Sequence, residues 1–169
     1  MTTVHGPTDA GVSIRQAVHA DLLDVYRIET SSFPQPWPFS SFVEFVGEDG
    51  FLVADAGPPA DSSSADVVGY VVSDVVPNDG WPIGHVKDLA VHPDRRGEGI
   101  GRSLLERSLQ VLGTEGVTHV KLEVRPSNEP AQALYAAYGF RHHRTVSGYY
   151  ADGENAHVLV ADLRDRQRF

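Results

Sequence analysis

A glycine-rich turn offers the clearest chemistry in the sequence. Residues 95–101 are Arg-Arg-Gly-Glu-Gly-Ile-Gly and stand between an apolar segment, His85–Val91, and a stretch with leucines at helical spacing. Glycines let successive backbone N–H groups turn inward without Cβ clashes, and a helix N-terminus adds partial positive charge. With the flanking arginines, the turn predicts an anion-binding nest suited to a pyrophosphate. A plain tight connection is the alternative, and neither GxGxxG nor GxxxxGK[ST] matches.

A carboxylate and a phenol on consecutive expected elements form the second candidate. Strand alternation places Glu123, with its basic neighbours Lys121 and Arg125, on the face opposite two apolar side chains. Pro130 and Gly139 suit the first turn and the end of a helix. Tyr135 lies on one continuous face of that helix, so core packing is the alternative explanation for it.

The turn resembles a known family. Arg96 to Gly101, preceded by a strand ending Leu-Ala-Val, is similar to the [Q/R]xxGx[G/A] signature of the GNAT acetyltransferase superfamily. The resemblance implies acetyl-CoA as the cofactor and CoA as a product. It implies that the pyrophosphate is held by Arg96, Gly97, Glu98, Gly99, Ile100, Gly101 and Arg102. It also implies that the pantetheine arm binds like an added strand to Leu89, Ala90 and Val91.

The segments 122–128 (LEVRPSN) and 133–140 (ALYAAYGF) resemble the ribosomal-protein-alanine N-acetyltransferase (RimI-type) branch. This resemblance implies that Glu123 is the general base, that Tyr135 contacts the cofactor as general acid at the CoA sulfur, and that Asn128 binds pantetheine or CoA. The roles suit the chemistry, because an amine must lose a proton before it attacks a thioester and a thiolate must then leave. Glu29 is the reserve base, with a solvent-facing helical charge as the alternative.

Two segments point to the acceptor. Residues 148–155 (GYYADGEN) contain the hairpin signal Asp-Gly and resemble the loop between the last two strands of archaeal and eukaryotic N-terminal acetyltransferases, whose tyrosines hold the substrate backbone. We therefore expect Tyr149 and Tyr150 to bind the acceptor. The proline-stiffened segment 33–38 (FPQPWP) could offer Phe33 and Trp37 as a wall for the acceptor's first residue; a core plug is the alternative.

The elements that must position these residues alternate between helix and strand. We expect strands at 12–16, 51–55, 67–72, 85–91, 117–124, 140–146 and 156–163. We expect helices at about 20–31, 99–112 and 128–138, and a short helix that starts at the capping box formed by Ser41 and Glu44. This order predicts a mixed α/β (α+β) domain with a largely antiparallel sheet. The resemblance implies the GNAT fold, a seven-stranded sheet flanked by about four helices. We expect a disordered leader at 1–11, a single domain at 12–163 and a C-terminal tail at 164–169.

Composition narrows the function classes. The chain has 169 residues and no cysteine, which excludes disulfides, thiolate metal sites and a cysteine nucleophile. Its net charge is −9 and it contains two lysines, so nucleic acid is not expected as the main ligand, whereas a basic tail of a ribosomal protein would suit the acidic surface. A salt-rich cytoplasm and a GC-rich genome both explain the composition. His142 and His143 lack partners at ligand spacing, so no metal site is expected.

These observations predict an N-acetyltransferase acting on a protein or peptide N-terminus, with a ribosomal protein as one candidate acceptor. We expect a cytoplasmic monomer or weak homodimer that engages neither nucleic acid nor membrane, since no apolar stretch reaches the length of a membrane helix. Acetylation of a small-molecule amine and a non-catalytic CoA-binding module are the alternatives. His85 and His92 flank the expected cofactor strand; we expect structural roles, although either could relay a proton.

Overall fold

Seven strands and four α-helices make up the part of the chain that the computed structural model describes, residues 11–57 and 65–166. The strands are β1 Ser13–Gln16, β2 Phe51–Asp55, β3 Val67–Val76, β4 Ile83–Val91, β5 His119–Val124, β6 Arg141–Val146 and β7 Ala156–Asp162. The α-helices are α1 Leu22–Ser32, α2 Phe39–Phe45, α3 Ile100–Thr114 and α4 Glu129–Ala137, and short 3-10 helices are η1 His19–Asp21, η2 Pro93–Arg95 and η3 Leu163–Arg166.

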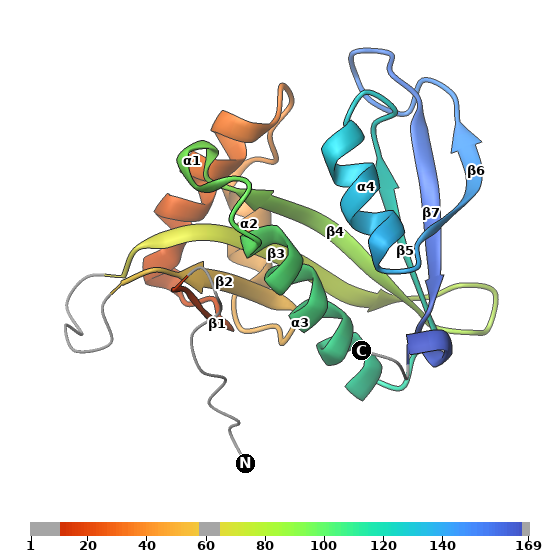
Figure 1. The fold of residues 1–169 in the computed structure, drawn as a ribbon, viewed down its shortest axis with the longest axis horizontal. Helices are drawn as coiled ribbons and strands as arrows, with labels where there is room; N and C mark the ends of the chain where they lie inside the picture. Colours follow the sequence, from red (N-terminus) through yellow and green to blue (C-terminus); the bar gives the residue numbers. More distant parts are fainter. Residues whose placement is uncertain (1–10, 58–64, 167–169) are drawn as a thin grey trace. The chain divides into compact units, whose positions relative to one another are not determined.

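The strands form one mixed sheet in the order β1-β2-β3-β4-β5-β7-β6. Most neighbouring pairs are antiparallel, and the β4–β5 pair is parallel. The predicted seven-stranded, mostly antiparallel sheet with four helices is therefore confirmed (Figure 1). The expected leader, apart from Gly11, most of the loop at 56–66 and the last three residues of the expected tail lie outside the described residues.

The chain divides into two compact units, which we describe separately. Unit 1 comprises Met1–Val72 and Asp88–Ser108, and unit 2 comprises Ser73–Lys87 and Leu109–Phe169. β3, β4 and α3 each contribute residues to both units.

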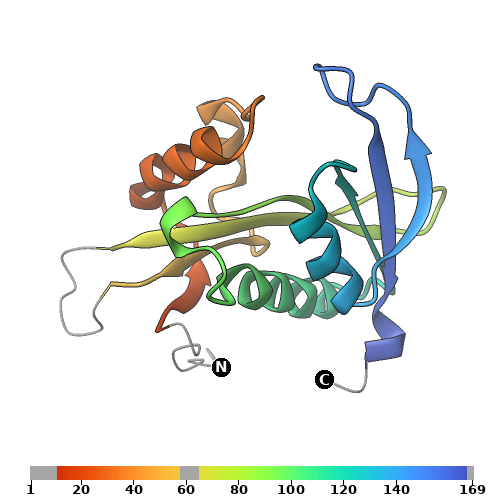
Figure 2. The same cartoon turned by 45° about the horizontal axis from the view of Figure 1, so that its top comes forward.

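Unit 1 is a layered structure with helices on both faces of its strands. In Figure 2, α1 and α2 lie on one face of β2 and β3, and the start of α3 lies on the other. Alternation along the strands divides the apolar side chains between these faces. On the α1 face they form a buried cluster that contains Leu22, Val25, Ile28, Phe42, Phe51, Val53, Tyr70 and Val72.

The α3 face of unit 1 is packed closely at Gly69. A Cβ built on this glycine would lie 3.0 Å from Leu104 Cδ1 and 3.2 Å from the Ala90 carbonyl oxygen. A larger residue would push the helix away from the strand, since protein interiors have few voids to absorb the extra volume. The start of α3, which follows the glycine-rich turn, is therefore held against the strands of unit 1.

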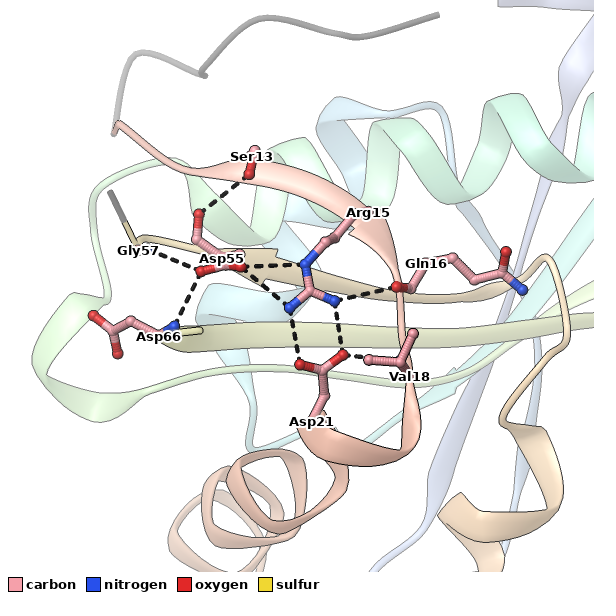
Figure 3. A network of polar contacts seen from close by, with 8 residues as sticks. All are labelled: Ser13, Arg15, Gln16, Val18, Asp21, Asp55, Gly57 and Asp66. Atoms are coloured by element: carbon pink, nitrogen blue, oxygen red, sulfur yellow. Dashed lines mark hydrogen bonds and ion pairs between the residues drawn. The ribbon is translucent and has the colours of Figure 1, made fainter. Parts of the chain in front are cut away.

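A polar network around Arg15 joins β1, η1 and the β2–β3 connection (Figure 3). The guanidinium donates to both carboxylate oxygens of Asp21 at 2.7 and 2.8 Å and to Asp55 Oδ2 at 3.2 Å. Asp55 Oδ1 in turn accepts the backbone N–H groups of Gly57 and Asp66, at 2.8 and 3.0 Å. Asp21 is only 1% exposed, so this bidentate pair compensates a buried charge.

Unit 2 is built on three antiparallel strands in the order β5-β7-β6, with β4 parallel to β5 at its beginning. The β4–β5 pairs are Gly84 with Val120 and His85 with Lys121. A Cβ on Gly84 would lie 3.0 Å from Val120 Cγ2 and 3.1 Å from Leu112 Cδ1, so the end of α3 packs closely here. Helix α4 connects β5 to β6 and lies beside β5 in Figure 1.

Two predicted boundaries were wrong. Helix α2 begins at Phe39 with Pro38 as its N-cap, and the Ser41 N–H donates to the Pro38 carbonyl at 3.0 Å. Ser41 is therefore inside the helix and forms no capping box with Glu44. Proline fits a cap position because it lacks the N–H that a helix interior requires. Strand β3 extends to Val76, beyond the predicted end at Val72.

Candidate functional site

The glycine-rich turn of unit 1 has the backbone that an anion nest requires. Gly97 and Gly99 adopt φ values of 80° and 83°, a left-handed conformation that side-chain-bearing residues rarely adopt. Helix α3 then begins at Ile100, and the first intrahelical bond runs from the Ser103 N–H to the Gly99 carbonyl at 3.1 Å. The N–H groups of the first helical residues have no intrahelical acceptor, so they and the helix dipole provide donors for an anion.

Two side chains of the turn bind within unit 1. The Arg96 guanidinium donates to the Val91 carbonyl at 3.1 Å and to Ser32 Oγ at 3.1 Å. The Glu98 carboxylate pairs with Arg95 at 2.9 Å. The turn residues Arg96 and Glu98 are thus available to a ligand through their backbone, and the donor set of backbone amides at a helix N-terminus fits a pyrophosphate.

The strand that precedes the turn is β4, and its last three residues are the predicted pantetheine partners, Leu89, Ala90 and Val91. Ala90 is buried in the core of unit 1, whereas Leu89 and Val91 are partly exposed. The His92 N–H donates to the Val68 carbonyl at 2.8 Å, which fixes the end of this strand. His92 itself accepts the Asp94 N–H through Nδ1, and this local contact agrees with the structural role expected for it.

In unit 2, Glu123 lies on β5 between two basic partners. Its Oε2 is 2.6 Å from His85 Nε2, and its Oε1 is 3.5 Å from Lys121 Nζ. Burial alone would raise the pKa of the Glu123 carboxyl, but the hydrogen bond and charge of His85 and the charge of Lys121 lower it below its usual value. Its side chain is 15% exposed, so Glu123 is a partly accessible carboxylate held in one orientation.

The sequence predicted the face on which Glu123 lies but not its partner. Residues of β5 alternate between buried and partly buried, which confirms the predicted alternation. His85 belongs to the parallel strand β4 and pairs there with Lys121. The signal that could have indicated the contact is the position of His85 in a neighbouring strand, but sequence alone does not give the register.

Tyr135 and Asn128 belong to α4 and its cap. Tyr135 is 8% exposed and its ring contacts Phe140 edge-on, with centroids 5.9 Å apart. The core contact considered as an alternative is thus present, and it fixes the ring that carries the phenol. Asn128 is the N-cap of α4, where its Oδ1 accepts the Ala131 N–H at 3.2 Å.

The turn between β6 and β7 places two tyrosines near Glu123. Tyr149 and Tyr150 contact each other edge-on at 4.9 Å, and the Tyr149 side chain is half exposed. Burial, followed by the charge of Glu123, raises the pKa of Tyr149. Burial is also the main cause that raises the pKa of Tyr150 to about 12, with the charge of Glu123 contributing. Both phenols therefore lie within electrostatic reach of the carboxylate and keep their protons at neutral pH.

Arg125 fixes this turn, a role that the sequence analysis did not identify. Its Nη1 donates to Asp152 Oδ2 at 2.8 Å and to Glu154 Oε1 at 3.0 Å. Its Cζ also lies 3.9 Å from the ring centroid of Tyr150, a cation–π contact. Glu154 further accepts the N–H and hydroxyl of Ser127. The end of β5 and the tyrosine turn are thus joined by one set of charged contacts, which we call the Arg125 clamp.

Asn155 stands between the tyrosine turn and β7. Its Oδ1 accepts the Gly148 N–H at 3.0 Å, while the Tyr150 N–H donates to the Glu154 carbonyl at 3.1 Å. These contacts close the turn on both sides of the tyrosines. An amide oxygen can accept a backbone N–H, so Asn155 helps to hold the turn closed.

The proline-rich segment belongs to unit 1. Phe33 and Trp37 are partly buried and pack against the core of that unit, and the Trp37 ring lies 5.5 Å from Phe42 and 6.1 Å from Phe45. Glu29, the reserve base, is 1% exposed. The alternative of a solvent-facing charge was therefore wrong for Glu29, and this burial also removes it from direct contact with a dissolved amine.

The described residues offer no metal cluster of three or more ligands and no membrane-spanning helix. In 11–57 and 65–166, no group of three or more His, Asp or Glu side chains is arranged to hold a metal ion. His142 instead lies 2.9 Å from the Thr145 hydroxyl. None of the helices in the described part of the chain is long and apolar enough to cross a membrane.

Comparisons with known proteins agree with these features. An N-alpha-acetyltransferase of Sulfolobus acidocaldarius is 36% identical over 165 residues, covering 89% of this chain and 92% of the relative. The [ribosomal protein bS18]-alanine N-acetyltransferase of Escherichia coli is 31% identical, with coverages of 83% and 90%. The fold is shared with a chain of the NatC complex bound to Gag peptide and CoA, at a TM-score of 0.81, 18% identity and coverages of 89% and 98%.

A family model confirms the resemblance that the turn and the Glu123 strand indicated. The model of the acetyltransferase (GNAT) family matches residues 22–140, a range that contains the glycine-rich turn, Glu123 and Tyr135. The chain belongs to the acetyltransferase (GNAT) family.

Proposed function

We propose that the protein transfers the acetyl group of acetyl-CoA to the N-terminal α-amine of a protein by direct attack on the thioester. The observation that carries this proposal is in unit 2, where Glu123 is held by His85 and lies within electrostatic reach of Tyr149 and Tyr150. A carboxylate can take a proton from an amine, and phenols beside it can bind a peptide backbone. Relatives named as N-alpha-acetyltransferases support this acceptor class.

The cofactor is acetyl-CoA, and we propose that the turn of unit 1 binds its pyrophosphate. The groups that would hold it are the backbone N–H groups of Arg96–Arg102, helped by the dipole of α3. We propose that the backbone of Leu89 and Val91, two partly exposed residues, pairs with the pantetheine arm, and that Asn128 and Tyr135 contact the cofactor. When bound, acetyl-CoA supplies the thioester carbonyl that the amine attacks.

Glu123 acts in this proposal as the base. An α-ammonium group has a pKa of about 8, so it must lose a proton before its nitrogen can attack. Glu123 is ionised at neutral pH because its pKa is lowered, and it can accept that proton directly, through water, or with His85 sharing the charge. Tyr135 acts as the acid, and its phenol delivers a proton to the departing sulfur.

The acceptor is bound, in this proposal, by the half-exposed Tyr149 and by Tyr150, which the Arg125 clamp fixes. Phe33 and Trp37 of unit 1 form the apolar wall for its first residue. A ribosomal protein is the acceptor class we favour, because one relative is named for ribosomal protein bS18 and the net charge of −9 suits a basic partner. We place the reaction in the cytoplasm and assign the protein as a monomer or weak homodimer.

The test is acetylation of short peptides that begin with Ala, Ser, Thr or Met, followed by mass spectrometry. Wild type should acetylate the α-amine, and Glu123→Gln and Tyr135→Phe should each lower kcat/KM by about 100-fold, the usual contribution of one proton-transfer group. Glu115→Gln, at an exposed position, is the matched control. Acetylation of lysine side chains or small amines alone, or CoA binding without turnover, would show the proposal to be wrong.

A further inference from the structure

Glu29 is buried in unit 1 although it carries a carboxylate. It lies in α1 and is 1% exposed. Its Oε1 accepts the Trp37 backbone N–H at 2.9 Å, and its Oε2 accepts the Tyr70 hydroxyl. A buried carboxylate is costly unless its oxygens are hydrogen-bonded, and here both oxygens have donors. The Glu29 carboxylate is therefore bound through both oxygens inside unit 1 and is not a surface charge.

The same residue binds the proline-rich segment at a second point. The Phe33 N–H donates to the Glu29 carbonyl at 3.1 Å and so ends α1. Prolines have no N–H, so segment 33–38 has three backbone donors, at Phe33, Gln35 and Trp37. Glu29 accepts two of these three, one through its backbone and one through its side chain. Glu29 thus joins both ends of this part of the segment to α1.

Glu29, Tyr70 and Asp88 form a cluster in which hydrogen bonds hold the Glu29 carboxylate in place. Tyr70 is fully buried, and its hydroxyl also lies 3.2 Å from Asp88 Oδ2. One hydroxyl proton cannot serve two carboxylates, so a second proton on Asp88 satisfies the remaining contact. Burial, followed by the hydrogen bond and charge of Glu29, raises the pKa of Asp88 well above its usual value. A proton on Asp88 lets the Tyr70 hydroxyl donate to Glu29, whose other carboxylate oxygen accepts the Trp37 N–H.

Trp37 transmits this anchoring to the aromatic core. Its ring stacks near Phe45 and contacts Phe42, and Phe42 contacts Tyr70 edge-on at 5.6 Å. The backbone of Trp37 is held by Glu29 while its ring is held by α2, so a loss of the hydrogen bond would release one of two restraints. The backbone of Trp37 would then move more easily, while its ring keeps its contacts with Phe42 and Phe45.

We propose that Glu29 is a positioning residue for acceptor binding: its carboxylate anchors Trp37 and thereby fixes the segment that contacts the acceptor's first residue. The inference rests on the proposed function, in which Phe33 and Trp37 form that wall. Glu29 does not touch the reacting atoms. Its effect is on the affinity and selectivity for the acceptor, and the chemical step and the binding of acetyl-CoA do not depend on it.

The test compares Glu29→Leu, which removes both acceptor oxygens, with Glu29→Gln, which keeps one, and with Asp24→Asn, a partly exposed acidic position on the same helix. Amide exchange at Trp37, followed by NMR, should become about tenfold faster or more in Glu29→Leu, because its N–H loses a buried acceptor. The acceptor KM should rise about tenfold, while kcat and the KM for acetyl-CoA change less than about twofold. In Glu29→Gln, both the Trp37 exchange rate and the acceptor KM should stay close to the wild-type values. Asp24→Asn should change neither.

The two readouts separate failure of the inference from failure of the proposed function. Unchanged exchange at Trp37 in Glu29→Leu overturns the anchoring. Faster exchange with an unchanged acceptor KM overturns the role in acceptor binding. If wild type acetylates no peptide, the proposed function fails, and the exchange rate still decides the anchoring. Should Glu29→Leu not fold, Tyr70→Phe removes the other donor and should give the same exchange effect at smaller size.

Discussion

Unit 1 holds two pairs of acidic residues in different ways. Asp21 and Asp55 share the guanidinium of Arg15 (Figure 3), which donates to both. Glu29 and Asp88 share the phenol of Tyr70. A guanidinium is charged at every accessible pH, so the first pair always has a cation between its two carboxylates, whereas the second pair depends on a proton that can leave.

The pKa directions of the two pairs express this difference. Burial alone would raise the pKa of Asp55, but the N–H groups of Gly57 and Asp66 and the charge of Arg15 lower it. The pKa of Asp88 is raised by burial and by its neighbour Glu29. A fixed cation suits a joint that holds strands together, whereas a cluster that depends on a proton changes its hydrogen bonds when that proton leaves.

Removal of the cation should have the largest effect. Arg15→Met leaves Asp21 buried without its partner, and we expect the free energy of unfolding to fall by about 2 to 3 kcal/mol. Arg27→Met is the matched control, because Arg27 and Asp24 form an exposed pair at 3.6 Å, and its loss should cost less than about 0.5 kcal/mol. Urea unfolding measures both. Equal losses in the two variants would mean that the buried pair contributes no more than a surface pair.

Removal of the titrating acid should raise stability at alkaline pH. The folded protein binds a proton on Asp88 that the unfolded chain releases near the ordinary pKa of 3.8. Stability therefore falls as pH rises from about 4 toward the raised pKa. Asp88→Asn imitates the protonated acid, and we expect a gain of about 1 kcal/mol or more at pH 8, since one pKa unit corresponds to about 1.4 kcal/mol.

Asp55→Asn should change the pH dependence of stability in the opposite direction. Because the folded pKa of Asp55 is lowered, its stabilisation is present above pH 3.8 and is lost as pH falls through the folded pKa. The variant should therefore be less stable than wild type at pH 7, with the difference disappearing in acid. Thermal unfolding of wild type and both variants from pH 3 to pH 9 measures the slopes. Parallel curves for Asp88→Asn and wild type would contradict a shared proton.

The sequence was sufficient for the elements of the site whose determinants are local. Alternation placed Glu123 on the correct face of β5, and glycine spacing predicted the turn in which Gly97 and Gly99 have positive φ. These properties depend on neighbours within a few residues. The family resemblance also covered this part of the chain, and the matching family model confirms it.

Contacts between distant residues could not be predicted in the same way. Glu29 has helical spacing with the buried Leu22 and Val25, and this spacing indicates that it lies on the apolar face of α1. Its hydrogen-bond donors, Trp37 and Tyr70, come from other elements and could not be predicted from that spacing. The register that brings His85 to Glu123 depends on the pairing of β4 with β5. The predicted capping box at Ser41 was wrong for a local reason: Pro38, three residues earlier, is the N-cap of α2.

The Arg125 clamp in unit 2 extends the comparison to a partly exposed set of charges. Glu154 accepts from Arg125 and from the N–H and hydroxyl of Ser127, whereas Asp152 accepts from Arg125 and from the Glu154 N–H. Glu154→Gln should therefore loosen Tyr150 more than Asp152→Asn does. We expect the acceptor KM to rise about threefold, a small change typical of exposed charges.

High salt gives an independent measure of the same clamp. Salt screens charges that lie farther apart than the Debye length, which is about 3 Å at 1 M salt, and the Arg125 pairs at 2.8 and 3.0 Å stand at that limit. The acceptor KM of wild type should therefore move part of the way toward that of Glu154→Gln as salt increases, and the variant should respond less. Because Tyr150 also contacts the Arg125 guanidinium through its ring, part of the restraint should survive. If salt raises the acceptor KM equally in both proteins, Glu154 does not act through charge, and the tyrosine turn is held by its backbone hydrogen bonds alone.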